Sequence, residues 1–219
     1  MIAALLSTGG MADDTQTEPD DEWPAWVEEE EALRAQIAAV NEGDLSFLER
    51  APSETLHHHR NRVLISERSL VDGWVLLEQC HDNLDRVAEA QIVFHPERSR
   101  AIRIVSSRNI GSAVAQQSSV QLRDIGTGSQ VCLMVETRAL HQLASGIYEL
   151  QNGPFMRRFL DGYYPMRVSL KIEYPQRLLL ADVSPVAQPG FSVDKAPGTV
   201  AAEALFEGRL RTRFVFLDQ

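Results

Sequence analysis

The sequence predicts a mainly β protein: an antiparallel β-sandwich, built as one large unit or as two small halves, preceded by an N-terminal helical arm. Three observations lead to this fold class. Apolar and polar residues alternate with a period of two after residue 61, turn signals interrupt this pattern at short intervals, and a helical period is confined to the N-terminal part. Hydrophobic residues make up 44% and charged residues 24% of the 219 residues, which is typical of a globular protein.

The first 22 residues are interpreted as a truncated remnant of a secretory signal peptide followed by a disordered acidic segment. Met1 to Leu6 is apolar, but this run is shorter than the ~7–15 residues of a signal core, and Arg34 is the first basic residue. Residues 10–12 fit a small-residue cleavage site. Asp13 to Glu22 is too acidic and too poor in large apolar residues to fold alone. The alternative is that the true start is Met11.

Residues 23–55 are expected to form the helical arm. Asp21 can cap its start, Pro24 suits the first turn, and Glu28 to Glu31 lie where the helix dipole favours negative charge. The stripe at helical spacing is Val27, Glu30, Leu33, Ile37 and Val40, widened by Trp26. A second short helix is expected after Asp44, with Phe47 facing inwards. Packing of the stripe on the β body is favoured over binding of a separate partner.

Residues 56–219 form the predicted β body, with halves at 56–145 and 146–219 if it is divided. In the ranges 167–174 and 209–216, apolar residues alternate with polar ones, which indicates strands with one buried face. Further strands are expected at 62–66, 73–80, 90–95, 101–106, 119–124, 130–137, 147–150, 178–183, 191–195 and 199–206. Turn signals separate them at 96–97, 126–128, 152–154, 189–190 and 197–198.

The cysteines, Cys80 and Cys132, lie 52 positions apart on two of these strands. We expect them to form a disulfide, because closing such a loop stabilises a fold by about 4 kcal/mol in the chain-entropy model. Disulfides are typical of oxidising compartments, so a periplasmic or secreted location is predicted. The alternative is a cytoplasmic protein with two buried free thiols.

The charge distribution argues against nucleic-acid binding. The net charge is -10, and the 14 acidic and three basic residues up to position 60 account for it, while the remainder is almost neutral. Arginine greatly outnumbers lysine, but a GC-rich genome explains this bias, and Arg209, Arg211 and Arg213 are expected on a solvated strand face. No apolar run reaches the ~18 residues of a membrane-spanning helix.

Residues His57 to His59 suggest a metal site, since neutral imidazoles bind zinc, copper and nickel. Neighbouring residues of an extended chain point to opposite sides, so His57 and His59 would face the same way, and His81 could add a ligand. The alternative, which is favoured, is an exposed polar loop before the first strand. We expect no cofactor, because the standard local signatures of cofactor binding and catalysis are missing from the sequence.

The segment 152–166 is the most unusual part of the sequence. Its candidate ligand-binding residues are Arg157, Arg158, Asp161, Tyr163 and Tyr164. Guanidinium groups bind carboxylates and phosphates with two hydrogen bonds, and tyrosine rings offer flat apolar surface. The favoured alternative is a helical turn that caps one end of the body. In that case Phe155 and Phe159 are buried, Arg158 pairs with Asp161, and at least one of the two tyrosines is partly exposed.

These features predict an exported, soluble, β-rich protein that acts as a non-enzymatic binding or assembly module of the cell envelope. Its expected partner is another protein or a small anionic ligand. One alternative is a hydrolase-type enzyme with a site near Arg157 to Tyr164. Another is a metal-binding protein that uses His57 to His59.

Overall fold

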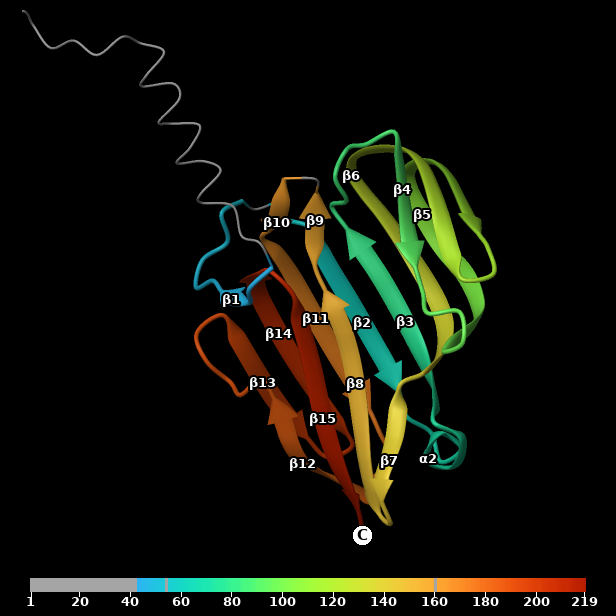
Figure 1. Cartoon of the computed structure of the whole chain (residues 1–219), viewed down its shortest axis with the longest axis vertical. Helices are drawn as coiled ribbons and strands as arrows, with labels where there is room; N and C mark the ends of the chain where they lie inside the picture. The colour runs from blue at the N-terminus through green and yellow to red at the C-terminus, as the bar shows by residue number, and fades with distance from the viewer. Residues whose placement is uncertain (1–42, 54, 160) are drawn as a thin grey trace, which may run out of the picture. The chain divides into compact units, whose positions relative to one another are not determined.

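The computed structural model describes residues 43–219, apart from residues 54 and 160. The predicted signal remnant and the part of the helical arm up to residue 42 lie outside the described residues. The described part is nearly all β, which confirms the prediction of a mainly β protein (Figure 1). No helix within it has both the length and the apolar character that crossing a membrane requires.

The strands follow one another with little intervening structure in the described part. In order, the elements are β1 (Ser46–Phe47), β2 (His58–Leu64), α2 (Ser69–Asp72), β3 (Trp74–Asp82), β4 (Glu89–Val93), β5 (Ser99–Ala115), β6 (Ser119–Arg138), β7 (Leu140–Ala144), β8 (Ile147–Phe155), β9 (Arg157–Phe159), β10 (Gly162–Tyr164), β11 (Met166–Glu173), β12 (Leu178–Ser184), β13 (Phe191–Ala196), β14 (Thr199–Glu207) and β15 (Leu210–Asp218).

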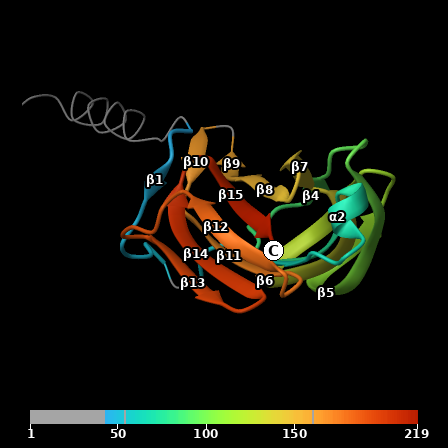
Figure 2. The same cartoon turned by 90° about the horizontal axis from the view of Figure 1, so that it is seen from below.

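Two sheets make up the body. The larger runs in the order β1-β14-β11-β2-β3-β6-β4, with β13 paired to β14 and β5 paired to β6. The smaller has the order β12-β15-β8-β7, and β9 and β10 form a separate hairpin. Figure 2 shows β8, β12 and β15 lying over part of the larger sheet.

One strand pair corrects the prediction of purely antiparallel sheets. Strands β2 and β11 are parallel, with His59 opposite Val168 and Val63 opposite Ile172. Parallel neighbours need a long crossover, and the chain from β3 to β10 supplies it. The pairing also joins residues from both sides of position 145 in one sheet.

The main hydrophobic core lies between the two sheets. Val168 and Ile172 of the larger sheet and Leu150, Phe214 and Phe216 of the smaller are completely buried and belong to one cluster. Burial of each such side chain contributes about 1.5–3 kcal/mol. Because the buried positions alternate with exposed ones, the period of two in the sequence identifies the core faces of these strands.

Strand β6 spans a predicted turn. Two strands separated by a turn at 126–128 were expected, but Ser119–Arg138 is one continuous strand. Val120 and Leu133, from its first and second halves, belong to the same second hydrophobic cluster, so β6 bends around that cluster. Positive φ angles at Asp124 (54°) and Gly128 (64°) accommodate the bend. The residues that signal a turn therefore bend a strand here rather than end it.

The beginning of the described chain also differs from expectation. Ser46 and Phe47, which fall in the predicted helical arm, pair with β14 as the short strand β1. The ring of Phe47 packs on Phe191, with 5.4 Å between their centroids. An aromatic contact between two strands that both pair with β14 thus takes the place of the expected second helix.

Residues 152–154 form a bulge within β8 rather than the predicted turn. Leu210 pairs with Phe155 and Thr212 with Asn152, which leaves two residues of β8 opposite one residue of β15. A Cβ atom at Gly153 would lie 2.6 Å from the carbonyl oxygen of Leu210. The glycine is therefore needed for close approach of the strands.

Candidate functional site

The segment 157–164 folds as the β9–β10 hairpin, which corrects the predicted helical turn. Arg157 pairs with Tyr164 and Arg158 with Tyr163, so each pair has its side chains on one face of the hairpin. Gly162 has a φ of 145°, which glycine adopts easily and an α-helix excludes. Figure 1 shows the hairpin between the ends of β8 and β11.

The hairpin separates two phenylalanines that a helical turn would have stacked. Phe155 is 4% exposed, as predicted, whereas the prediction that Phe159 is buried is wrong, because it is 37% exposed. Phe159 instead makes an edge contact with Tyr164, with 5.5 Å between ring centroids. Tyr163 and Tyr164 are both partly exposed, in agreement with the prediction for at least one of them.

On one face of the hairpin, Arg157 binds Asp85 with two hydrogen bonds. Its Nε donates to Oδ2 of Asp85 at 3.0 Å and its Nη2 to Oδ1 at 2.5 Å. The guanidinium also lies 5.6 Å from the ring of Tyr164, whose hydroxyl donates to Asp161 at 2.6 Å. That hydrogen bond raises the pKa of Tyr164. Arg157 therefore ties the hairpin to the loop after β3, and Asp161 binds Tyr164 instead of the predicted Arg158.

On the other face, two arginines flank one tyrosine. The guanidinium carbons of Arg158 and Arg209 lie 5.5 Å and 5.6 Å from the ring centroid of Tyr163. Both arginines are exposed, and neither forms an ion pair with any described carboxylate. Nε of Arg209 donates to the carbonyl oxygen of Gly43 at 3.3 Å. We call Arg158, Tyr163 and Arg209 the arginine–tyrosine face.

The five predicted ligand-binding residues therefore divide into two groups. Arg157, Asp161 and Tyr164 hold the hairpin together, while Arg158 and Tyr163 meet Arg209. Arg209 was expected on a solvated strand face, and its contact with Tyr163 was not predicted. Gly208, which has a positive φ of 85°, turns the chain between β14 and β15 just before Arg209. A glycine in the sequence indicates such a turn, but it does not indicate which side chain the next residue contacts.

The predicted metal ligands form a stack at the inner face of the larger sheet. Nε2 of His57 lies 3.1 Å from Nδ1 of His81, and the ring of His59 lies 4.2 Å from that of His81. Gln79 places its amide nitrogen 2.7 Å from Nε2 of His81. With that nitrogen as donor, neutral His81 carries its proton on Nδ1 and donates it to His57. Phe155 makes a T-shaped contact with His59, with 5.1 Å between ring centroids, and closes the stack.

All three imidazoles are held neutral. Burial lowers the pKa of His57 to about 4, with Arg157 lowering it further and Asp85 opposing the shift. Burial lowers the pKa of His59 to about 3, and it lowers that of His81 well below the usual value of 6.5. A charge in this stack would lose its hydration without gaining a buried counter-ion.

A metal centre needs at least three side chains that converge on one point. Among the residues that the structure describes, no group of three or more His, Cys, Asp or Glu side chains is arranged to hold a metal ion. Nε2 of His59 and Oδ1 of Asn61 are buried without a hydrogen-bond partner, and so are Nδ2 of Asn152 and Oγ1 of Thr212 on the smaller sheet. Buried polar atoms of this kind commonly form hydrogen bonds with internal water molecules. Metal binding by the histidines stays a prediction.

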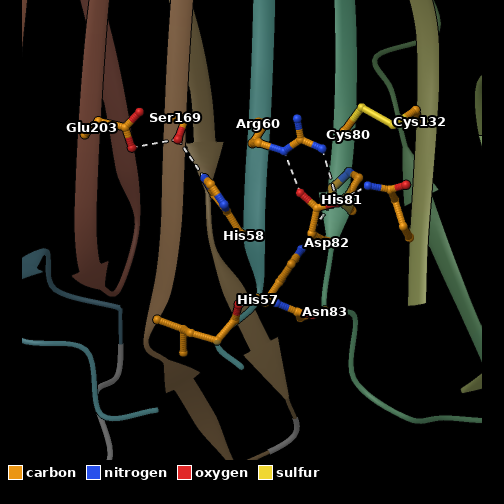
Figure 3. A network of polar contacts seen from close by, with 12 residues as sticks. His57, His58, Arg60, Cys80, His81, Asp82, Asn83, Cys132, Ser169 and Glu203 are labelled. Carbon is orange, nitrogen blue, oxygen red and sulfur yellow. Dashed lines mark hydrogen bonds and ion pairs between the residues drawn. A yellow bond between two sulfur atoms is a disulfide. The ribbon is translucent and has the colours of Figure 1, made fainter. Parts of the chain in front are cut away.

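The outer face of the larger sheet carries a separate polar network (Figure 3). The hydroxyl of Ser169 donates to Glu203 at 2.6 Å, and Nε2 of His58 lies 2.6 Å from the same hydroxyl. In a hydrolytic triad the histidine stands between serine and carboxylate and takes the serine proton. Here the serine stands in the middle, and its proton goes to a carboxylate. The arrangement is that of a cross-strand hydrogen-bond ladder rather than an activated nucleophile.

The predicted disulfide between Cys80 and Cys132 is present in the structure. The two residues lie directly opposite each other on β3 and β6, with their Cα atoms 4.1 Å apart, on the same outer face (Figure 3). Next to it Asp82 receives hydrogen bonds from Arg60 and Gln130. Burial alone would raise the pKa of Asp82, but these two hydrogen bonds outweigh it and lower the pKa. The disulfide suggests an oxidising compartment.

Comparison with known proteins gives little further information. No protein-family model and no curated protein matches the chain. Among solved structures, an M1 zinc metallopeptidase from Deinococcus radiodurans bound to a Tyr-Ser-Ala substrate is 9% identical, over 74% of this chain and 42% of that chain, with a TM-score of 0.43. Another structure of an M1 zinc metallopeptidase from that organism is 11% identical, over 81% and 43%, with a TM-score of 0.41. The chain thus spans less than half the length of either structure, and similarity this low does not bear on function.

Proposed function

We propose that the chain is a non-enzymatic binding or assembly module of the cell envelope, exported to an oxidising compartment, and that it docks an acidic protein partner on the arginine–tyrosine face. One observation carries the proposal: two guanidinium groups that have no carboxylate partner among the described residues lie close to a single, partly exposed tyrosine ring. A partner carboxylate would supply the missing charge and accept two hydrogen bonds from one guanidinium.

Both the residue types of the arginine–tyrosine face and the fixed position of its hairpin suit a protein partner. Tyrosine and arginine are, with tryptophan, enriched at the energetic centres of protein interfaces. The ion pair between Arg157 and Asp85 fixes the hairpin from its other face, so the two faces have separate roles. A pre-positioned hairpin loses little conformational entropy when a partner binds.

The hydrolase alternative near Arg157 to Tyr164 has less support. This stretch contains no Ser, Cys or His, so a nucleophile and its base would have to come from other strands. The hydrogen-bonded serine and histidine in the described part, Ser169 and His58, lie on the outer face of the larger sheet in an order that does not activate the serine.

Site-specific photo-crosslinking in the producing cells tests the proposal. A photoreactive phenylalanine at Tyr163 should capture an acidic protein that the same group at Val186, which is 71% exposed elsewhere on the chain, does not capture. With the captured protein purified, Arg158→Glu should raise the Kd at least tenfold, which corresponds to about 1.4 kcal/mol. Arg108→Glu, an exposed control, should leave the Kd unchanged. Equal capture at both positions, or an unchanged Kd for Arg158→Glu, would contradict the proposal.

A further inference from the structure

A second candidate binding site lies away from the arginine–tyrosine face, between α2 and β7. The structure has a pocket of about 580 Å³ there, a size typical of small-molecule sites. Arg98 and Arg138 line it together with His141 and Gln142, and the buried ring of Tyr148 forms part of its wall. Figures 1 and 2 both show α2 beside β7.

The backbone of Gly73 holds the two sides of this pocket together. Gly73 ends α2 with a φ of 77°, and its carbonyl oxygen accepts a hydrogen bond from the amide of Leu140 at 3.2 Å. A Cβ atom at this position would lie 2.7 Å from the carbonyl oxygen of Leu140. A glycine is therefore required for α2 and β7 to meet, and the pocket is built into the fold.

The lining of the pocket contains two arginines and two acidic residues, and one of these acids already has its own partners. The carboxylate of Asp72 is already bound, since it accepts from the amide of Trp74 at 3.0 Å and from Nε of Arg68 at 3.1 Å. Among the described residues, neither Arg98 nor Arg138 has a carboxylate partner, and Glu97 is the remaining acidic group of the lining.

We infer that this pocket binds a small, polar molecule that carries a carboxylate or phosphate group, held by Arg98 and Arg138. Guanidinium groups recognise both kinds of oxyanion through paired hydrogen bonds, and His141 and Gln142 offer polar contacts to the rest of the molecule. A lining of this composition does not suit an apolar ligand. The inference is independent of the proposed protein partner, because the two sites share no residue.

A titration followed by amide NMR of the whole chain tests this inference. Citrate and inorganic phosphate are the probes, added at constant ionic strength, and sucrose is the uncharged control. At least one anion should shift the amide signals of Gly73, His141 and Gln142 with a saturating dependence, while sucrose should not. Saturation with citrate alone would assign a carboxylate ligand, and saturation with phosphate alone a phosphate ligand.

Substitutions separate specific binding from general anion attraction. Arg98→Gln and Arg138→Gln should each weaken the anion at least tenfold, whereas Arg108→Gln, the same charge change on the exposed side of β5, should not. If Arg138→Gln fails to fold, Arg98→Gln and the wild-type titration still decide the matter. Absence of saturable shifts at these three amides, or equal affinity in all variants, would overturn the inference. Arg158→Glu should leave this titration unchanged whatever its effect on a protein partner.

Discussion

Acidification should unfold this protein through its inter-sheet histidines. The unfolded chain binds protons at histidine below a pH of about 6.5, whereas the folded chain keeps His57 neutral to a pH of about 4 and His59 to about 3. Since the folded-state pKa values are lowered, the free energy of unfolding is highest above pH 6.5 and falls as the pH drops toward 4 and then 3.

The size of the effect follows from linkage. Below pH 6.5, each such histidine lowers the free energy of unfolding by about 1.4 kcal/mol per pH unit. At pH 5 the loss is therefore about 2 kcal/mol for one histidine and about 4 kcal/mol for His57 and His59 together. Burial shifts His81 in the same direction, so it adds to the loss. The free energy of unfolding of a typical domain is only about 5–15 kcal/mol, so this loss is a large part of it. The carboxyl of Glu173 has a pKa lowered to about 2 by Arg62 and Lys171, so its contribution is lost only below pH 4.5.

Urea unfolding at pH 7.5, 6.5, 5.5 and 5.0 measures this loss. Between pH 6.5 and 5, the slope of the free energy of unfolding against pH should be smaller in His59→Gln than in the wild type, by the equivalent of about one proton. His95→Gln, at an exposed position, is the control and should leave the slope unchanged. A free energy of unfolding that is constant from pH 7.5 to 5, or a decline that is the same in wild type and His59→Gln, would refute the account of the stack as a buried neutral cluster.

Two other expectations concern stability and a third concerns dynamics. Without reduction, the denatured protein should contain no reactive thiol, and replacing Cys80 and Cys132 by serine should lower stability by about 4 kcal/mol in denaturant titrations. Phe155→Ala should cost about 3–5 kcal/mol in a thermal melt, but Phe159→Ala only about 1 kcal/mol, and equal losses would contradict the hairpin. Arg157→Ala should speed amide exchange in β9 and β10 without changing that of β8, since it removes the anchor to the body.

The sequence allowed the strands to be located well, because alternation identifies a buried face whatever lies opposite. It could not order them in the sheets. The parallel pairing of β2 with β11 depends on contacts between residues far apart in the chain, such as Val63 and Ile172. Turn residues were also ambiguous. Gly128 and Gly153 lie within bent or bulged strands, where the same backbone freedom that makes a turn allows a bend.

The candidate site was predicted in part. The segment 157–164 does gather arginine and tyrosine side chains, but a helical period and a strand period group them differently. The spacing of Phe155 and Phe159 fitted a helical turn, and only the pairing of Arg158 with Tyr163 shows which residues share a face. Arg209 joins them from the turn before β15, a contact that no local pattern predicts.

Hydrogen–deuterium exchange of the chain in complex with its crosslinked partner tests the central claim, that the arginine–tyrosine face is the docking surface. Binding should protect the amides of Gly162, Tyr163 and Arg209, while those of the exposed strand β5 should exchange as in the free chain. Protection confined to β5 or to the outer face of the smaller sheet, with the hairpin unchanged, would contradict the account.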